Sequence, residues 1–290
     1  MKTKKKGVAA AAVIIVVSAI LLVVFSPYLL SFKDNAAARR YMDTDLQNVD
    51  NIVLLAHCVE IEGQSNSVAG FKESLRQGAD AVVVDLCFKP DGTPVMTDDY
   101  GKINSAPLLE KLFKTMNEEK YAESRVFLNI IQLSNFSVLN KLVVDYNLAA
   151  RLTIIGIDEK HYELVRSEDT IVPLYLNYKI TADDLSAIDD GTFEAPYVID
   201  KYGADGIVIS YSDCSEKAIE ALDDYGIPAV VGSVDTASQF CSVLSDNAKM
   251  VYVKNAENSR NILDSWITAM QDRYQSSVEK SLEELSKKNK

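Results

Sequence analysis

The chain has 290 residues, of which 48% are hydrophobic and 25% are charged, a composition typical of folded proteins. This length suffices for one large α/β domain and excludes a small disulfide-stabilised scaffold. Because 42 Asp and Glu residues outnumber 30 Lys and Arg residues, the formal net charge is −12. An acidic chain of this kind is a poor partner for nucleic acid, and the excess charge is typical of a solubilising surface.

The amino-terminal segment has the pattern of a membrane anchor. Four lysines within residues 1–6 precede an uncharged, apolar run over residues 7–32. A helix needs about 20 such residues to cross a bilayer. We therefore expect a cytoplasmic basic tail (1–6), a single transmembrane anchor (7–32) and all following residues on the extracellular side of the cell membrane. A cleaved signal peptide, with Ala36–Ala38 at the cleavage site, is the alternative, although its apolar core would span only about 7–15 residues.

The polar segment that follows, residues 33–50, contains Arg39 and Arg40 and predicts a short helical or flexible stalk. From residue 52 onward, short runs rich in β-branched residues alternate with amphipathic stretches of helical length. The predicted strands are Ile52–His57, Ala81–Leu86, Val126–Gln132, Leu152–Gly156, Ile171–Leu176, Gly206–Ser210, Pro228–Gly232 and Met250–Lys254. The predicted helices are Ser67–Gln77, Leu108–Glu118, Phe136–Tyr146, Glu159–Arg166, Ala182–Asp189, Ser215–Tyr225 and Thr236–Leu244.

This alternation predicts parallel strands joined by crossover helices. Eight such units favour a TIM (β/α)8 barrel over residues 51–256, followed by a C-terminal helix over residues 257–290. A doubly wound open sheet is the alternative. It would require a glycine-rich phosphate loop after the first strand. Residues 58–67, which follow that strand, contain a single glycine, Gly63.

The four cysteines, Cys58, Cys87, Cys214 and Cys241, lie outside the membrane in this topology, where disulfides are permitted. Three pairings are possible, and none of the four has the spacing of a metal site. Cys58 and Cys87 lie at the ends of neighbouring predicted strands and are candidates for a disulfide. Buried free thiols are the alternative.

A set of ordered motifs extends across the predicted barrel. They are Val53-Leu-Leu-Ala-His57, Ser65-Asn-Ser67, Gly78-Ala-Asp80 through Asp85, Pro90-Asp-Gly92-Thr-Pro-Val95, Asp98-Asp99, Gly203-Ala-Asp-Gly206 and Gly226-Ile-Pro-Ala-Val-Val-Gly-Ser-Val234. In order and spacing they resemble the glycerophosphodiester phosphodiesterases, whose patterns read A-H-R-G, P-E-N-T, G-A-D-x-I-E-x-D-V, D-G-x-P-V, H-D, G-A-D-G and G-x-x-V-x-x-W-T-V. The resemblance covers residues 52 to 255 and implies the same barrel.

The resemblance also implies a candidate site at the carboxyl ends of the strands. Members of that family hydrolyse phosphodiesters with two histidines and a divalent metal held by carboxylates. His57 matches the first histidine, and Asp98 stands in place of the second. Asp85 and Asp99 match two family aspartates, so they are the candidate metal ligands.

Six other positions depart from the family pattern, among them Val59, which replaces the glycine of A-H-R-G. Cys58 replaces the phosphate-binding arginine, and Val83 replaces one carboxylate of the E-x-D pair. Ile131 and Leu133 replace a glutamate and a lysine, and Gly232 replaces an aromatic residue. A carboxylate at position 98 has an unperturbed pKa near 4, so it is ionised at neutral pH and is a poor acid.

These losses lead to three hypotheses. The first is a membrane-anchored pseudoenzyme, a non-catalytic binding module without a cofactor that takes a protein or small-molecule ligand at the barrel mouth. The second is an active phosphodiesterase that hydrolyses glycerophosphodiesters or phospholipid headgroups. It would hold Ca²⁺ or Mg²⁺ with Asp85, Asp98 and Asp99 and use His57 as acid or base, although Asp98 and Asp99 also suit a simple turn. The third is a structural module that assembles through residues 257–290.

Overall fold

The computed structural model describes residues 34–46, 49–134, 136–167, 171–193, 199, 201 and 203–288. The predicted basic tail (1–6) and anchor (7–32) lie outside these residues. No helix within the described ranges is long and apolar enough to cross a membrane.

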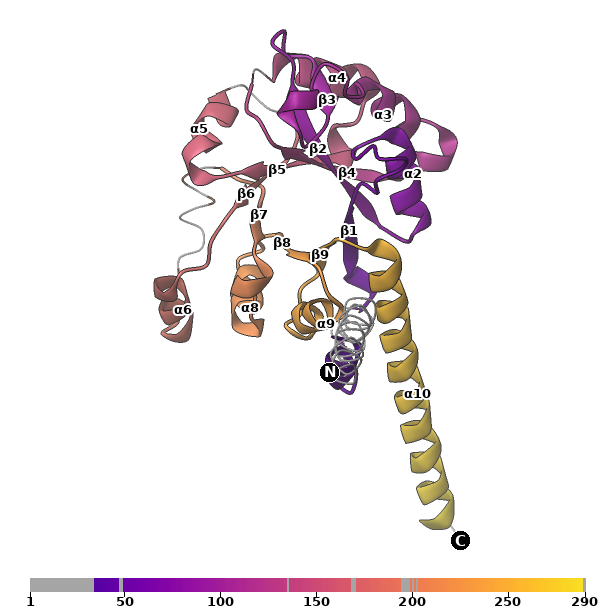
Figure 1. Cartoon of the computed structure of the whole chain (residues 1–290). Helices are drawn as coiled ribbons and strands as arrows, with labels where there is room; N and C mark the ends of the chain where they lie inside the picture. The colour runs from indigo at the N-terminus through magenta and orange to yellow at the C-terminus, as the bar shows by residue number, and fades with distance from the viewer. Residues whose placement is uncertain are drawn as a thin grey trace, which may run out of the picture.

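Eight parallel strands form a closed barrel (Figure 1). The strands are β1 (Val53–His57), β2 (Ala81–Phe88), β4 (Arg125–Ile130), β5 (Leu152–Ile157), β6 (Leu174–Asn177), β7 (Gly206–Ile209), β8 (Ala229–Val234) and β9 (Met250–Val253). β1 pairs with β9 on one side and with β2 on the other, which closes the sheet. The predicted (β/α)8 barrel is therefore confirmed, and the open-sheet alternative is wrong.

The strands are buried on both faces, as parallel sheets are. All eight residues of β2, AVVVDLCF, are buried. Leu55, Val83, Phe127 and Ile155 point into the barrel with other apolar side chains and fill its interior. The alternate residues face the surrounding helices, so nearly every strand position reads as apolar.

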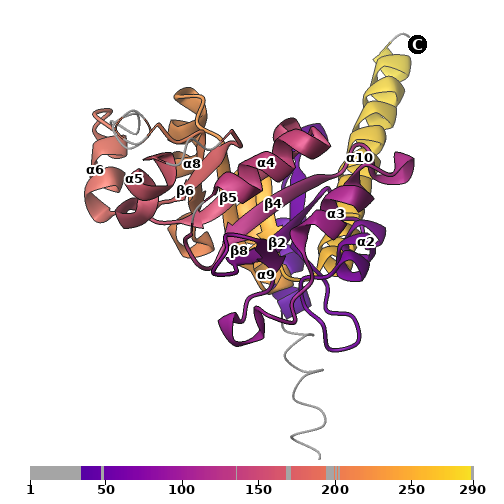
Figure 2. The same ribbon diagram turned by 90° about the horizontal axis from the view of Figure 1, so that it is seen from above.

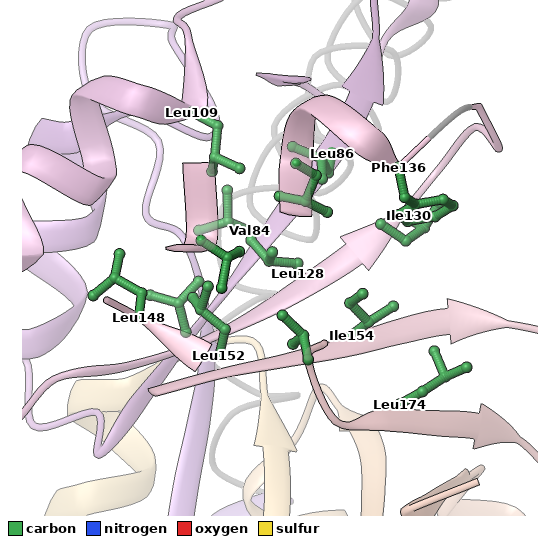
Figure 3. Packing of buried hydrophobic residues seen from close by; sticks show 14 of the residues in the cluster. Val84, Leu86, Leu109, Leu128, Ile130, Phe136, Leu148, Leu152, Ile154 and Leu174 are labelled. Atoms are coloured by element: carbon green, nitrogen blue, oxygen red, sulfur yellow. The ribbon is translucent and has the colours of Figure 1, made fainter. Parts of the chain in front are cut away.

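The helices cover the outside of the barrel. They are α2 (Val68–Arg76), α3 (Leu109–Met116), α4 (Ser137–Tyr146), α5 (Glu159–Ser167), α6 (Ala182–Asp189), α8 (Glu216–Asp224), α9 (Ala237–Ser245) and α10 (Ala256–Lys288). Figure 3 shows the apolar layer between strands and helices, in which Leu86 and Leu128 lie near Leu109 and Phe136. Ser67, Thr181, Ser215 and Thr236 cap helices with their hydroxyl groups, which fixes where these helices begin.

A short strand that the sequence did not predict, β3 (Pro94–Met96), pairs antiparallel with the end of β2. Pro94 lies at the edge of the sheet, where its missing N–H is tolerated. The 3₁₀ helix η2 (Tyr100–Lys102) follows it. This hairpin extends the carboxyl end of β2 and carries Asp98 and Asp99 to the rim of the barrel.

The predicted stalk packs against the barrel. Residues 34–41 are helical, and the chain continues along α9 and α10, where Ala38 and Leu46 are buried. The indole Nε1 of Trp266 on α10 donates to the carbonyl oxygen of Thr44 at 2.9 Å. Arg273 donates to the carbonyl oxygens of Met42 and Thr44. The helical alternative thus holds for residues 34–41, and the segment is part of the folded domain.

The last helix, α10, is much longer than the barrel requires. Its 33 residues span about 50 Å. Its first half carries Leu263 and Trp266, which are buried. Its second half extends past the barrel (Figure 2), and Tyr274 there is 74% exposed.

Candidate functional site

The barrel places His57 and Asp85 side by side at the carboxyl ends of the strands, the mouth of the barrel. His57 is the last residue of β1 and lies in register with Val83 on β2. Asp85 lies two residues further along β2 and is in register with Asn129 on β4. Because side chains alternate along a strand, Val83 and Asp85 face the same side. The apolar residue lies in the packed interior, and the carboxylate lies one layer above it.

Three side chains donate hydrogen bonds to the Asp85 carboxylate. The His57 Nε2 lies 2.9 Å from Oδ2, the Asn66 Nδ2 lies 3.1 Å from Oδ2, and the Asn129 Nδ2 lies 2.7 Å from Oδ1. Asn66 also accepts a bond from the Asp85 backbone N–H at 2.8 Å. A carboxylate offers about four lone-pair sites, so these donors occupy most of them. Asp85, which is only 4% exposed, is therefore held by the protein itself.

Both ring nitrogens of His57 are engaged as well. Nδ1 lies 3.1 Å from the carbonyl oxygen of Cys58, while Nε2 faces the Asp85 carboxylate. Neither of these acceptors has a proton to give, so the doubly protonated imidazolium satisfies both contacts. In this arrangement both ring nitrogens of His57 already have partners within the protein.

The electrostatics of the pair agree with its geometry. The hydrogen bond to Asp85 raises the pKa of His57 above its usual value, against the opposing effect of burial, and the charge of Asp98 acts in the same direction. Burial opposes ionisation of Asp85, but the hydrogen bonds from His57, Asn129 and Asn66 outweigh it and lower the pKa of this carboxyl group. The two residues form a charged, hydrogen-bonded pair.

The other two candidate carboxylates serve the loops around them. Asp98 accepts a hydrogen bond from the Ser65 hydroxyl at 3.3 Å. Asp99 accepts from the backbone N–H of Gly101 at 2.8 Å, which caps η2, and lies 3.6 Å from the Lys102 Nζ. Across the described part of the chain, no group of three His, Cys, Asp or Glu side chains is arranged to hold a metal ion.

Cys58, at the family's arginine position, is buried under α2. Its Sγ donates to the carbonyl oxygen of Ser67 at 3.4 Å, and burial raises its pKa to about 11. A Cβ on Gly70 would lie 2.9 Å from this sulfur and 2.1 Å from the carbonyl oxygen of Val59. The close approach of α2 to β1 leaves the Cys58 side chain in the apolar layer. All four cysteines are free thiols, so Cys58 and Cys87 follow the free-thiol alternative and do not form a disulfide.

Of the other substituted positions, Val83 and Ile131 carry apolar side chains, and Gly232 has no room for a larger side chain. Val83 is fully buried in the barrel interior, whereas Ile131 is 45% exposed at the mouth. A Cβ on Gly232 would lie 2.5 Å from the carbonyl oxygen and 2.8 Å from the Cβ of Tyr252 on the neighbouring strand. Tyr252 therefore occupies the space that a larger residue at position 232 would need, and burial raises the pKa of its hydroxyl group.

A cavity of about 630 Å³ opens beside this network. Its lining includes His57, Glu60, Ser233, Asp235, Tyr252 and Lys254. The volume lies within the range of small-molecule sites. Lys254 provides positive charge in the cavity, His57 has a raised pKa, and Glu60 and Asp235 provide negative charge, so the lining suits a ligand with groups of both signs.

Sequence reasoning missed Asn66, Asn129, Tyr252 and Lys254. Asn129 had a visible signal, because it is an amide in an otherwise apolar strand and such a group must find a partner when buried. Asn66 has positive φ (54°), which asparagine tolerates better than most residues. The pairing of both amides with Asp85 depends on tertiary placement across 19 and 44 residues of sequence.

Comparison with known proteins gives matches among solved structures only. No family model matches the sequence, and no curated protein does. The chain is similar to a glycerophosphodiester phosphodiesterase from Parabacteroides distasonis (TM-score 0.58, 17% identity), covering 74% of this chain and 98% of that one. It is also similar to a glycerophosphodiester phosphodiesterase from Agrobacterium tumefaciens (TM-score 0.57, 13% identity), covering 73% of this chain and 98% of that one.

A phosphodiesterase from Oleispira antarctica, solved with the product sn-glycerol-3-phosphate, gives a TM-score of 0.55 and 12% identity, with 73% of this chain and 96% of that chain covered. By fold the protein thus belongs to the (β/α)8 barrels. More narrowly, its barrel has the fold of the glycerophosphodiester phosphodiesterases, which confirms the structural resemblance that the sequence predicted.

Proposed function

We propose that the chain is a non-catalytic relative of the glycerophosphodiester phosphodiesterases that binds a ligand at the mouth of its barrel. The observation that carries this proposal is the state of His57 and Asp85. Hydrogen bonds within the protein engage both ring nitrogens of the histidine and both oxygens of the carboxylate. A general acid or base needs a free site within reach of the ligand, and a metal ion at Asp85 would have to compete with three donors that occupy most of its lone-pair sites.

The substitutions around the pair support the same proposal. Val83 and Ile131 supply no oxygen ligand, and Cys58 supplies no positive charge for a phosphate. In a preorganised site, loss of one charge-stabilising group costs roughly 100- to 1,000-fold in rate. Several such losses, although not additive, leave little of the inherited mechanism.

We also propose that residues 7–32 anchor the domain in the cell membrane, with the barrel on the extracellular face. The support for this part of the proposal is the sequence: one uncharged apolar run follows a cluster of lysines. The ligand would then be an extracellular small molecule or protein.

One observation favours the active alternative. The negative charges of Asp85 and Asp98 both raise the pKa of His57, with Asp85 contributing more. If a divalent cation displaced the amide donors from Asp85, then Asp85, Asp98 and Asp99 would be the residues to hold it.

A hydrolysis assay separates the two. The purified chain and its His57→Ala variant would be incubated with glycerophosphocholine or glycerophosphoethanolamine, in the presence of Ca²⁺, Mg²⁺ or a chelator. We expect no metal-dependent release of glycerol phosphate from either protein. Turnover that requires metal and disappears in His57→Ala would refute the non-catalytic proposal, whereas turnover that is equal in both proteins would indicate a contaminant.

A further inference from the structure

Asp34 shows at which edge of the barrel the amino-terminal segment begins to pack. Asp34 accepts hydrogen bonds from the backbone N–H groups of Ala237 (2.7 Å) and Ser238 (3.0 Å), the first residues of α9. Because α9 follows the carboxyl end of β8, its first turn lies at the mouth edge of the barrel. The chain therefore enters at the mouth.

From that point the chain runs toward the opposite edge. Thr44 bonds to Trp266, and the Leu46 N–H bonds to the sulfur of Met270. These two partners lie progressively further along α10, which begins at the mouth and extends away from it. In Figure 1 the indigo segment lies beside α9 and the first part of α10. The predicted stalk is thus docked along the barrel and provides no spacer between the anchor and the mouth.

Only residue 33 separates the predicted anchor (7–32) from the docked Asp34. The two Cα–Cα steps from residue 32 to residue 34 span at most about 7 Å. If residues 7–32 lie in a bilayer, the edge of the barrel next to Asp34 has to lie at the bilayer surface.

The side chains at this edge are suited to such a surface. Tyr100, Ile131 and Tyr211 are 56%, 45% and 40% exposed. Ile131 and Tyr211 follow the carboxyl ends of the parallel strands β4 and β7, and Tyr100 follows the hairpin that extends the carboxyl end of β2. Tyrosine and apolar side chains prefer the interface between headgroups and hydrocarbon. The end of α10 projects from the opposite side, beyond the reach of a bilayer at the mouth (Figure 2).

We propose that the mouth of the barrel faces the membrane surface, with the loops that carry Tyr100, Ile131 and Tyr211 against the lipid headgroups. This inference rests on the anchor in the proposed function. The neighbouring Asp98, Asp99 and Asp213 are acidic, so anionic lipids would repel this face, and a zwitterionic headgroup layer fits it better. The tether sets the orientation, and ligands reach the cavity from the membrane side.

Lipid quenching in vesicles tests the orientation. The full chain would be reconstituted into phosphatidylcholine vesicles that contain a lipid with a nitroxide headgroup. A fluorophore would be attached to a single introduced thiol in Lys102→Cys at the mouth, Lys120→Cys at the opposite edge or Lys287→Cys near the end of α10. Native thiols compete little, since Cys58, Cys87 and Cys241 are buried and burial raises the pKa of the half-buried Cys214 to about 12.

We expect quenching at position 102 to be several-fold stronger than at positions 120 and 287. As a control, about twelve Gly and Ser residues inserted before Asp34 would lengthen the tether by roughly 20 Å and reduce quenching at position 102. Stronger quenching at position 120 or 287, or equal quenching at all three, in chains that float with the vesicles would refute the orientation alone. Failure of the chain to float with the vesicles would refute the anchor, and the orientation with it.

Discussion

The mouth network around Asp85 and the contact between residues 34–46 and α10 stabilise the domain in different ways. At the mouth, four polar side chains satisfy one another at distances of 2.7–3.1 Å. Beside α10, the fully buried indole of Trp266 packs with Ala38 and Leu46, and a few hydrogen bonds fix the register. The comparison shows that hydrogen bonds between polar side chains hold the mouth together, whereas the predicted stalk contributes apolar side chains to the packing of the domain.

The largest difference between the two regions should appear in stability. Replacement of Trp266 by Ala removes a fully buried side chain, which typically costs about 3–5 kcal/mol of unfolding free energy. Urea unfolding of the full chain would measure this loss. Tyr274→Ala, on the same helix but 74% exposed, is the matched control and should change stability by no more than about 0.5 kcal/mol. Equal effects of the two variants would mean that residues 34–46 do not pack on α10.

A smaller loss is expected at the mouth. Asp85→Ala leaves Asn66, Asn129 and His57 without their shared acceptor, which we expect to cost about 1.5–3 kcal/mol. The control is Asp98→Ala, which removes one exposed hydrogen bond and should have little effect. Catalytic groups are often held at a cost to stability, so an Asp85→Ala protein as stable as the wild type would contradict the structural role of this carboxylate.

The hydrogen bonds between Asp34 and the start of α9 should contribute less to the free energy of unfolding. Its carboxylate satisfies two N–H groups at a helix start, as a capping residue does, so Asp34→Ala should cost about 1 kcal/mol. Thermal unfolding would compare this variant with Asn35→Ala, whose side chain is exposed. If both variants have the same melting temperature as the wild type, the amino-terminal end of residues 34–46 is not held at the mouth.

The pH dependence of stability should be the most modest effect. Because the folded-state pKa of His57 is raised, its contribution is complete below the unfolded value of about 6.5 and is lost as the pH rises through the raised pKa. Because the pKa of Asp85 is lowered, its contribution is complete above about 3.9 and is lost as the pH falls through the lowered pKa.

The wild type should therefore exceed His57→Gln in unfolding free energy most clearly between about pH 4 and 6.5. Denaturant unfolding of both proteins from acid to alkaline pH would measure this difference. A difference that grows above neutral pH would mean that His57 is neutral in the folded protein.

The sequence predicted the barrel well because the barrel depends on local patterns. The run Ala81–Leu86 reads as a buried strand, and Ser67 and Thr236 mark the starts of helices. The sequence did not predict the strand β3, because a run of three residues that begins with a proline is a weak strand pattern. Residues 34–46 read as a stalk because their few apolar residues show no periodicity. Their burial depends on α9 and α10, including Trp266, which lie about 200 or more residues further along the chain.

For the candidate site, the sequence pointed to residues but not to most of their contacts. Family motifs identified His57 and Asp85, and the structure places the two in contact. The motifs gave no indication of Asn66 and Asn129 as donors, because these contacts depend on the exact placement of β2, β4 and the loop before α2. This placement matters for the proposed function, because an Asp85 with free oxygens could hold a metal ion.

The most direct test of the non-catalytic mouth is a calorimetric titration of the full chain with Ca²⁺ and with Mg²⁺, to about 1 mM, the weak end of protein calcium sites. Since Asn66, Asn129 and His57 engage the Asp85 carboxylate, we predict no saturable heat of binding. Saturable binding that Asp85→Asn or Asp98→Asn removes would contradict this prediction and would show that a metal centre forms at the mouth.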